Sequence, residues 1–145
     1  MPTKTSNLVA RASITVAAPV EKVWDALVTP AAIKQYMFGT TVVSDWKVGR
    51  PIVWKGEWEG KAYEDRGEIR QFQPGRALQY THSSSQAEAA GRPDNAHLVT
   101  IQLSPEGNQT RVSLTQDNNR TEETRAQSEK NWNMMLSGLK KLVEG

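Results

Sequence analysis

The stretch "IVWKGEWEGKAYEDRGEIRQF", residues 52–72, has the pattern of two β-strands joined by a tight turn. Successive side chains of a strand point to opposite faces of a sheet, so one face of residues 52–58 carries Ile52, Trp54, Gly56 and Trp58. The next two residues, Glu59-Gly60, fit a two-residue turn into a strand over residues 61–72. Two indole rings on one face, with a glycine between them, predict a sheet that wraps around a space as well as a core.

The segments before this hairpin predict one strand, two short helices and a second strand. Residues 8–16 alternate along the chain in a way that is typical of a half-buried strand. Residues 18–30, "APVEKVWDALVTP", place apolar residues at helical spacing between two prolines, and a second short helix is expected over residues 31–36. Gly39 then leads into a strand at "TTVVSD", residues 40–45.

The segments after the hairpin predict three strands and a long helix. A turn at residues 73–76 leads into a strand over 77–83, and the small and polar residues 84–96 predict a loop. Strands at 97–103 and 110–118 flank a turn at 105–109. One face of residues 121–144 carries Trp132, Met135, Leu136, Leu139, Leu142 and Val143. A large antiparallel sheet covered by one long amphipathic helix makes an α+β fold, in which the sheet curves around that helix.

Composition limits the classes of protein to which the chain can belong. Its 145 residues fit a single domain, residues 1–145, and the fractions of hydrophobic (37%) and charged (23%) residues are those of a soluble globular protein. The 18 basic and 16 acidic residues are spread along the chain, so we expect no nucleic-acid partner. Without cysteine there is no thiolate nucleophile or thiolate metal site. We expect a cytoplasmic protein with no membrane partner, because neither a secretory signal nor a bilayer-spanning apolar run is present.

The turns also predict a register for the strands. The turn at residues 73–76 pairs Ile69 with Tyr80 and Gly67 with His82. Matching the apolar sets of the next two strands places Tyr80 beside Val99 and His82 beside His97. Closing the last hairpin places Val99 beside Leu114 and His97 beside Gln116. The polar residues that this register brings into one row are Asp65, His82, His97 and Gln116.

This polar row has two interpretations. It can bind the polar end of a ligand or act as an acid–base site, because histidine titrates near neutral pH and a carboxylate can orient it. It can equally be the solvated end of a sheet, where two strands meet the long loop. We expect no metal site, because no third good ligand has a defined position.

Five segments resemble a known family, in the family's order and over nearly the whole chain. They are "APVEKVWDALVTPAAIKQYMFG", "SDWKVGRPIVWKG", "GEIRQFQPGRALQYTHS", "VTIQLSPEGNQTRVSLTQDN" and "NWNMMLSGLKKLVEG". They are similar to the SRPBCC or START-like superfamily, specifically to the C-terminal domain of the activator of the heat-shock protein 90 ATPase. The resemblance implies a helix-grip fold: a seven-stranded antiparallel sheet curved around the long C-terminal helix, with two short helices after the first strand and an apolar cavity between sheet and helix.

The chain departs from the family's pattern at two positions. His82 stands where relatives often have tryptophan, and Gln71 stands where many have glutamate. These departures imply a cavity that is more polar at one end and less acidic than usual. The separate N-terminal domain of the full-length chaperone activator has no counterpart in this sequence, which weakens the transfer of chaperone activation.

The residues expected to line the cavity share the inward face or the helices that cover it. They are Met37, Phe38, Trp54, Trp58, Tyr63, Ile69, Tyr80, His82, Val99, Ile101, Trp132 and Met135. Large aromatic residues more commonly fill a core, so the same set can also be packing. Gly56 falls opposite Tyr63, where the missing side chain either lets the ring pack over bare backbone or leaves room. Trp24 and Trp46 are expected to be structural.

Three functions remain open from the sequence. The leading hypothesis is non-covalent binding of a small, mainly apolar or aromatic molecule without a cofactor. The alternative is a chaperone-interacting module whose partner is a heat-shock protein 90 homologue. The third is a cavity enzyme that acts on a cyclic or aromatic substrate. Because the chain has no Gly-x-Ser-x-Gly, phosphate-loop or His-Glu-x-x-His motif, we assign no catalytic residue and favour binding over catalysis.

Overall fold

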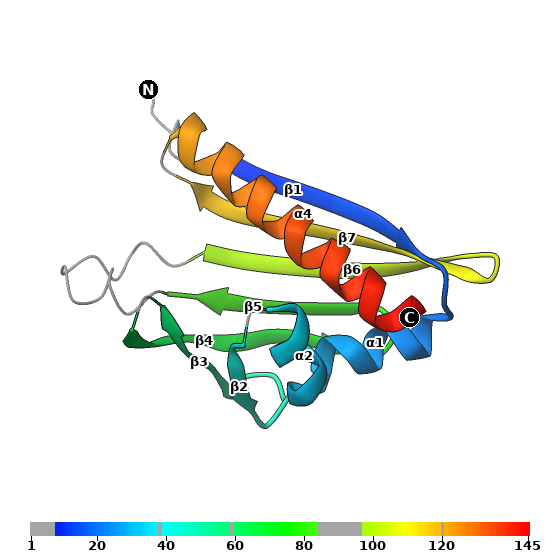
Figure 1. Ribbon diagram of the computed structural model, residues 1–145, viewed down its shortest axis with the longest axis horizontal. Coiled ribbons are helices and arrows are strands. Elements are labelled where there is room, and N and C mark those ends of the chain that lie inside the picture. Colours follow the sequence, from blue (N-terminus) through cyan, green and yellow to red (C-terminus); the bar gives the residue numbers. More distant parts are fainter. Residues whose placement is uncertain (1–7, 38, 59, 84–96, 120) are drawn as a thin grey trace.

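The structure is a computed structural model that describes residues 8–37, 39–58, 60–83, 97–119 and 121–145 (Figure 1). Its strands are β1 Leu8–Val16, β2 Thr41–Ser44, β3 Pro51–Trp58, β4 Lys61–Gln73, β5 Ala77–His82, β6 His97–Glu106 and β7 Gln109–Asn119. Its helices are α1 Val20–Val28, α2 Pro30–Tyr36 and α4 Glu122–Glu144. The predicted loop at residues 84–96 and the predicted cavity residue Phe38 lie outside the described residues, as does the side chain of Trp58.

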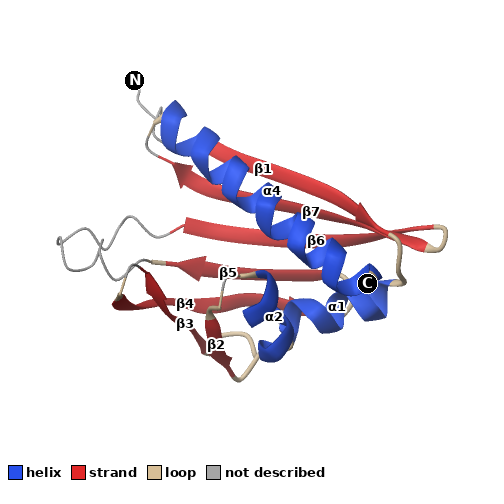
Figure 2. Cartoon of the chain, in the orientation of Figure 1, coloured by secondary structure: helices blue, strands red, loops and turns tan. Residues whose placement is uncertain are grey.

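The described strands form one antiparallel sheet of seven strands in the order β1-β7-β6-β5-β4-β3-β2 (Figure 2). Strands β2 to β7 follow one another as a meander, and β1 closes the sheet beside β7. The three helices lie on one face, where α4 runs across the sheet and contacts β1, β7 and α2. The α+β helix-grip fold predicted from the sequence is confirmed.

The core lies between this face of the sheet and the helices. Its fully buried side chains come from every layer and include Val16, Val23, Ile52, Ile69, Val99, Val112, Leu114, Leu136 and Leu139. Alternating residues of the strands and one face of α4 supply them, as the period of the sequence predicted. Gly138 of α4 lies against Tyr36 of α2, where an added Cβ would be 3.1 Å from the tyrosine Cβ. This close approach holds the two helices together over the sheet.

Gly67 lies where β4 passes very close to the backbone of β5. β4 pairs with β3 up to Glu68 and with β5 from Ile69 onward, with a β-bulge just after Ile69, and an isolated bridge also joins Arg66 to Ser83. A Cβ on Gly67 would lie 1.7 Å from the carbonyl oxygen of Thr81, so only glycine allows the two strands to approach here. Bulges and close backbone contacts of this kind bend a sheet, and here they help it to curve around α4.

The hairpin between β6 and β7 is tighter than the sequence predicted. The turn consists of residues 107–108 alone, with Gly107 at φ 64°, whereas a turn over residues 105–109 was expected. The partners shift by two residues in consequence: Val99 pairs with Gln116 instead of Leu114. The predicted pairing of His97 with Gln116 is therefore wrong. The predicted pairs Ile69–Tyr80, Tyr80–Val99 and His82–His97 are confirmed.

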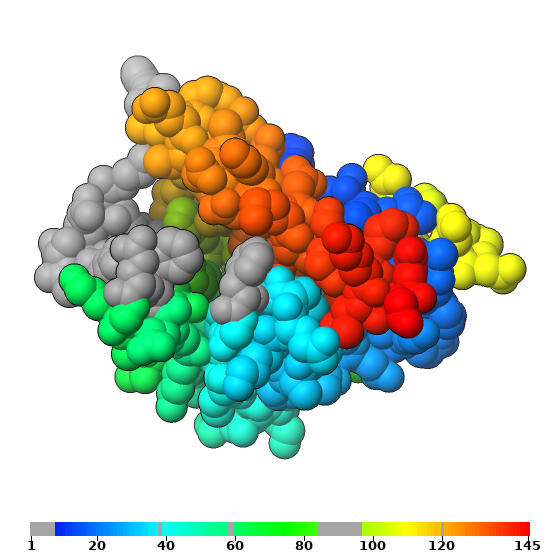
Figure 3. Space-filling view, viewed as in Figure 1, coloured from blue at the N-terminus to red at the C-terminus, as the bar shows by residue number. Residues whose placement is uncertain are grey.

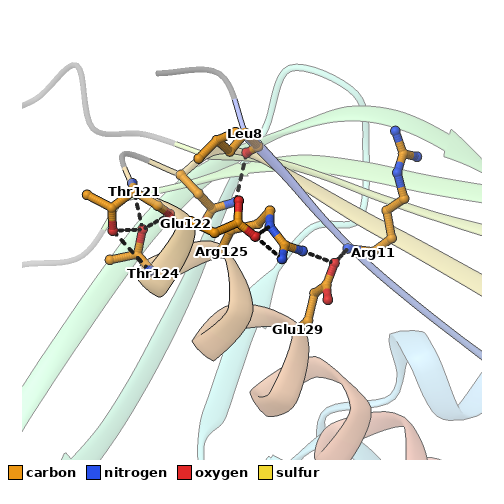
Figure 4. Close-up of polar contacts among 8 residues, drawn as sticks. Leu8, Arg11, Thr121, Glu122, Thr124, Arg125 and Glu129 are labelled. Carbon is orange, nitrogen blue, oxygen red and sulfur yellow. Dashed lines mark hydrogen bonds and ion pairs between the residues drawn. The ribbon is translucent and has the colours of Figure 1, made fainter. Parts of the chain in front are cut away.

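The first turn of α4 is capped and charged in the way that stabilises a helix N-terminus. The hydroxyl of Thr121 accepts a hydrogen bond from the N–H of Thr124 at 3.1 Å, and the Thr124 hydroxyl accepts one from the N–H of Thr121 at 3.1 Å. Arg125 then pairs with Glu122 and, at 2.5 Å, with Glu129 (Figure 4). The acidic side chains also complement the helix dipole.

Side chains of α4 fasten both ends of β1 through its free edge. The three contacts join Glu129 Oε2 to the N–H of Arg11 at 3.1 Å, Lys140 Nζ to the carbonyl of Thr15 at 2.9 Å, and Glu144 Oε2 to the N–H of Ala17 at 2.6 Å. They satisfy backbone groups that no neighbouring strand reaches, because β1 is the last strand of the sheet. These contacts set the position of α4 above the sheet.

Candidate ligand-binding site

An aromatic and polar cluster lies on the helix-covered face of strands β3, β4 and β5. We define the His82 cluster as Trp54, Asp65 and His82. Trp54 pairs with Asp65 across β3 and β4, and the Nε2 of His82 lies 3.2 Å from Oδ2 of Asp65. The His82 ring meets the Trp54 ring edge-on, with centroids 4.8 Å apart. The side chains of His82 and Asp65 are 30% and 18% exposed, so solvent reaches the cluster.

His97 lies beside the cluster but is oriented by a different group. It pairs with His82 across β5 and β6, and its Nδ1 lies 2.8 Å from the backbone carbonyl of Asp117. A carbonyl only accepts, so Nδ1 carries the proton and Nε2 remains an acceptor in the neutral ring. The Asp117 carboxylate in turn accepts the N–H of Leu98 at 2.7 Å. The predicted histidine pair therefore exists, with a carboxylate beside one ring and a backbone carbonyl beside the other.

Gln116 contacts α4 instead of the histidines. Its Oε1 accepts a hydrogen bond of 2.6 Å from the indole Nε1 of Trp132, and its side chain is buried. The next buried polar residue, Asn119, donates to the carbonyls of Leu8 and Gln116 at 3.0 Å each. Gln116 thus fixes the Trp132 ring over the sheet, and the predicted four-residue polar row is reduced to Asp65, His82 and His97.

The ring of Tyr63 occupies the space above Gly56, where a side chain is missing. The two residues pair across β3 and β4, and a Cβ on Gly56 would lie 2.4 Å from the Tyr63 hydroxyl oxygen. The hydroxyl groups of Tyr63 and Thr40 are 2.9 Å apart, within hydrogen-bond distance. The Tyr63 ring therefore packs over the bare backbone of Gly56.

One space in the apolar interior, next to the cluster, is small. The space there is about 30 Å³, the volume that one water occupies, whereas ligand pockets are typically 300–1,000 Å³. Its lining residues are Leu27, Ile33, Tyr36, Met37, Val42, Trp46, Ile52, Trp54, Leu78, Tyr80, Ile101 and Met135. The space that these residues line is much smaller than the ligand-sized hollow that we predicted, and the predicted lining side chains of Phe38 and Trp58 lie outside what the structure describes. Side chains from the three helices and the sheet interlock there.

Two tyrosines of this interior are held in the neutral form. Burial raises the pKa of the Tyr36 phenol well above its usual value, with a smaller contribution from Tyr80, and burial alone raises the pKa of Tyr80. The Tyr36 hydroxyl donates to the carbonyl of Ala26 at 2.9 Å. Tyr80 also packs against Trp54, with ring centroids 5.2 Å apart. A protonated phenol at this position is a hydrogen-bonding group for a neutral partner and cannot serve as a phenolate base.

The remaining predicted site residues divide between the small space and the core. Met37, Tyr80, Ile101 and Met135 line the space, whereas Ile69 and Val99 are fully buried in the core. Tyr36 and Trp46 also line the space and were missed as site residues. Trp46 adopts φ 57° and tilts its ring against Phe72, with centroids 6.3 Å apart. Trp46 lies beside the turn before β3, and the structural role expected for it agrees with its contact with Phe72.

The cluster has the chemistry of a binding site that can also move a proton. The carboxylate of Asp65 can orient the His82 imidazole, and an aromatic wall lies on one side of that ring. Three or more histidine, aspartate or glutamate residues do not come together as a metal site anywhere in the described residues. Among those residues, no helix is both long and apolar enough to cross a membrane.

In Figure 3, atoms of the sheet are visible in a recess between α4 and strands β3 and β4. Figure 3 also shows α4 and α2 in contact beside this recess. The His82 cluster belongs to strands on this side of the sheet, and Trp132 of α4 is bonded to Gln116 of β7 on the same face.

Comparison with known proteins identifies the family. Residues 17–144 match the family described as Activator of Hsp90 ATPase homolog 1-like protein, and the chain belongs to this family, within the START-like superfamily. No curated protein matches the chain. The solution structure of ChR145 from Cytophaga hutchinsonii is 55% identical, covers 99% of this chain and 97% of its own, and has a TM-score of 0.82.

Two more distant structures share the fold. The Aha1 dimer from Colwellia psychrerythraea is 22% identical, with 94% of this chain and 96% of that chain covered and a TM-score of 0.73. CalU16 from Micromonospora echinospora is 21% identical, with 97% and 87% covered and a TM-score of 0.72. The predicted resemblance to the START-like superfamily is confirmed.

Proposed function

We propose that this protein binds a small aromatic molecule carrying a hydrogen-bonding group, with the His82 cluster as the recognition element. The observation that carries the proposal is the contact between Trp54, His82 and Asp65 on a face that is mainly apolar and covered by helices. Polar side chains on such a face cost free energy unless they serve a ligand or one another. Here they remain partly exposed to solvent.

The stacking surface and the polar pair recognise different parts of the proposed ligand. Indole and imidazole rings favour an aromatic guest by offset or edge-on contacts. The imidazole of His82 and the carboxylate of Asp65 select a guest with a hydroxyl or amide group, because an unpaired buried polar group is costly to leave unmatched. Membership of the family supports ligand binding in general. The chemical class of the ligand is inferred from the side chains of the His82 cluster.

The small interior space restricts where the guest lies. A space of about 30 Å³ between Tyr80, Trp54 and Met135 admits no aromatic ring. The aromatic ring of the guest therefore lies over the His82 cluster, where solvent reaches the side chains. Flexible side chains such as Met37 and Met135 are suited to give way if the ring enters more deeply.

The experiment compares two probes that each carry one hydroxyl group, aromatic 2-naphthol and aliphatic cyclohexanol, by two-dimensional 1H–15N NMR of the indole N–H signals. We expect 2-naphthol to shift the Trp54 and Trp132 signals to saturation and cyclohexanol to shift them little. His82→Phe keeps a ring and removes its nitrogens, so it should weaken 2-naphthol binding roughly ten-fold, the effect of one lost hydrogen bond. Trp24→Phe, on the far side of the core in α1, is the matched aromatic control.

Two outcomes would contradict this proposal. Equal responses to the aromatic and the aliphatic alcohol would show that stacking plays no part. Unchanged 2-naphthol affinity in His82→Phe would show that the polar pair does not recognise the guest.

The family's description favours a second candidate, a module that docks on a chaperone of the heat-shock protein 90 type. The outward face of α4 offers a surface for it: Met134 is 50% exposed in a shallow hollow of about 510 Å³ that includes Lys130 and Lys141. An exposed methionine between two lysines suits an apolar and acidic partner surface.

The test mixes the protein with the heat-shock protein 90 homologue of its own organism and measures the ATPase rate and co-purification. Met134→Asp should abolish any effect, and Val43→Asp, at an exposed apolar residue of β2, is the matched control. No rate change and no co-purification with the unaltered protein would remove this candidate.

A further inference from the structure

Two Arg-x-Ser segments lie opposite one another at the edge of the sheet. Residues 11–13 of β1 read Arg-Ala-Ser and residues 111–113 of β7 read Arg-Val-Ser. Ser13 pairs with Ser113 in the antiparallel register. Antiparallel pairing relates the segments by a local two-fold axis, so each arginine lies two residues from the serine pair, on opposite sides.

These arginine and serine side chains point away from the helices. Their neighbours in each segment, Ala12 and Val112, are buried in the core, and alternation places Arg11, Ser13, Arg111 and Ser113 on the other face of the sheet. None of the described helices covers that face (Figure 1). The site is therefore separate from the His82 cluster.

The two guanidinium groups are available to a ligand. Arg111 Nη2 lies 3.3 Å from the hydroxyl oxygen of Ser13, a long contact that brings its fork over the serine pair. The Arg11 side chain extends away from Glu122, Arg125 and Glu129 in Figure 4. Among the residues that the structure describes, its guanidinium forms no ion pair or hydrogen bond.

A hollow of about 470 Å³ opens at this position. Its lining residues are Arg11, Ala12, Ser13, Arg111, Ser113, Leu114, Thr115 and Asn133. The lining contains two arginines, three hydroxyl groups and one amide, and no carboxylate. The acid nearest along α4, Glu129, is already held by Arg125 and by the N–H of Arg11. The charge that the hollow presents is therefore positive.

The edge of β1 adds a backbone donor. The N–H groups of Arg11 and Ala17 each donate to a carboxylate oxygen from α4, at 3.1 and 2.6 Å. N–H groups of alternate residues point to the same side of a strand, so the N–H of Ser13 points to the same free edge. An anionic oxygen in the hollow can accept from it in the way that the glutamate carboxylates accept from its neighbours.

We propose that this hollow is an anion-binding site for the phosphate group of a phosphate monoester. Two forked guanidinium groups match the oxygens of a phosphate, and the hydroxyls of Ser13, Ser113 and Thr115 supply further donors. The hollow is larger than one phosphate group, so the organic part of the ester lies beside the phosphate in the same hollow. This site is independent of the aromatic ligand proposed for the His82 cluster.

The experiment titrates phenyl phosphate and inorganic phosphate into the protein at constant ionic strength and follows the backbone amide signals by 1H–15N NMR. We expect saturating shifts at Ser13 and Ser113. Arg11→Gln and Arg111→Gln should each weaken binding about ten-fold or more, the usual effect of losing a charge-assisted hydrogen bond. Arg70→Gln removes the same charge from an arginine that is paired with Glu68, and it should leave the affinity unchanged.

The ester and the inorganic ion distinguish the two sources of phosphate. Tighter binding of phenyl phosphate supports a ligand with an organic group, as proposed, and tighter binding of inorganic phosphate overturns that part of the proposal. Shifts that rise linearly without saturation, or an equal loss in Arg70→Gln, would show general charge attraction and overturn the site. All three arginines are at the surface, and a thermal melt of each variant confirms that it is folded.

Discussion

Replacing Gly67 by alanine tests the contact that bends the sheet. The new methyl carbon would lie 1.7 Å from the carbonyl oxygen of Thr81, about half of an ordinary contact distance, and that oxygen belongs to the backbone. No rotation of a side chain can relieve the overlap. Strands β4 and β5 must therefore separate where they meet.

The cost follows from the hydrogen bonds that hold the strands at this position. Arg66 and Ser83 exchange two backbone bonds of 3.0 and 2.8 Å, and the N–H of Glu68 donates to the Thr81 hydroxyl at 2.9 Å. At about 1 kcal/mol each, losing the three bonds lowers the free energy of unfolding by about 3 kcal/mol. That is a large part of the roughly 5–15 kcal/mol that stabilises a domain of this kind.

The assay is urea unfolding followed by tryptophan fluorescence, with far-UV circular dichroism as a second probe. Gly107→Asn is the matched control: Gly107 has φ 64° and no atom within 4 Å of an added Cβ, and asparagine tolerates this conformation. We expect the control to unfold close to the original midpoint and Gly67→Ala well below it. A Gly67→Ala midpoint equal to that of the original chain would refute the account of the bend.

Three further predictions concern the site and the helix that covers it. Gly56→Ala displaces the Tyr63 ring and should lower the free energy of unfolding by about 1 kcal/mol in urea titrations, because the hydroxyl contact of the ring is lost. Trp132→Phe leaves the buried Gln116 oxygen unpaired, which should cost about 1–3 kcal/mol in the same assay. The hydrogen bond from the N–H of Arg11 and the guanidinium of Arg125 hold the pKa of Glu129 below its usual value. The ionised Glu129 therefore stabilises the fold at neutral pH, and this stabilisation should be lost as pH falls below the range in which an ordinary glutamate titrates.

Each of these predictions has a control. In Tyr63→Leu the ring that a methyl group on Gly56 would overlap is absent, so Gly56→Ala should lower the free energy of unfolding much less in that background. If the losses of the two single variants simply add in the double variant, the overlap between the methyl group and the Tyr63 ring is not the cause. Adding Gln116→Leu to Trp132→Phe should recover stability, since both polar partners are then absent. Glu129→Gln should be less stable than the original chain at pH 7 and depend less on pH between about 5 and 3. An unchanged pH profile would argue against the bond to β1.

Much of the site could be predicted from the sequence, because the turns and the alternation of apolar residues determine which residues of neighbouring strands lie side by side. The turn at residues 73–76 and the matched apolar sets were enough to place Ile69 beside Tyr80 and His82 beside His97. Asp65 follows from the same alternation on β4. The position of Gln116 could not be predicted in this way, since one ambiguous turn of two or five residues moves every partner on β7.

The sequence could not predict whether the interior is open or packed. Trp54, Tyr80 and Met135 line either a cavity or a packed core with the same spacing in the sequence. The outcome depends on how far α4 and α2 close over the sheet, which is set by contacts such as Gly138 with Tyr36. Those contacts join residues that are far apart in the chain, so no local pattern reports them.

The sequence determined the order of the elements, the inward face of each strand and the apolar face of α4. These features follow from alternation and helical period, which are local properties of the chain. Tertiary structure set the size of the space beside Trp54, the partner of Gln116, and the placement of Arg11 and Arg111 around one hollow. They arise from contacts between distant segments, whose distances depend on the closure of the whole sheet around α4.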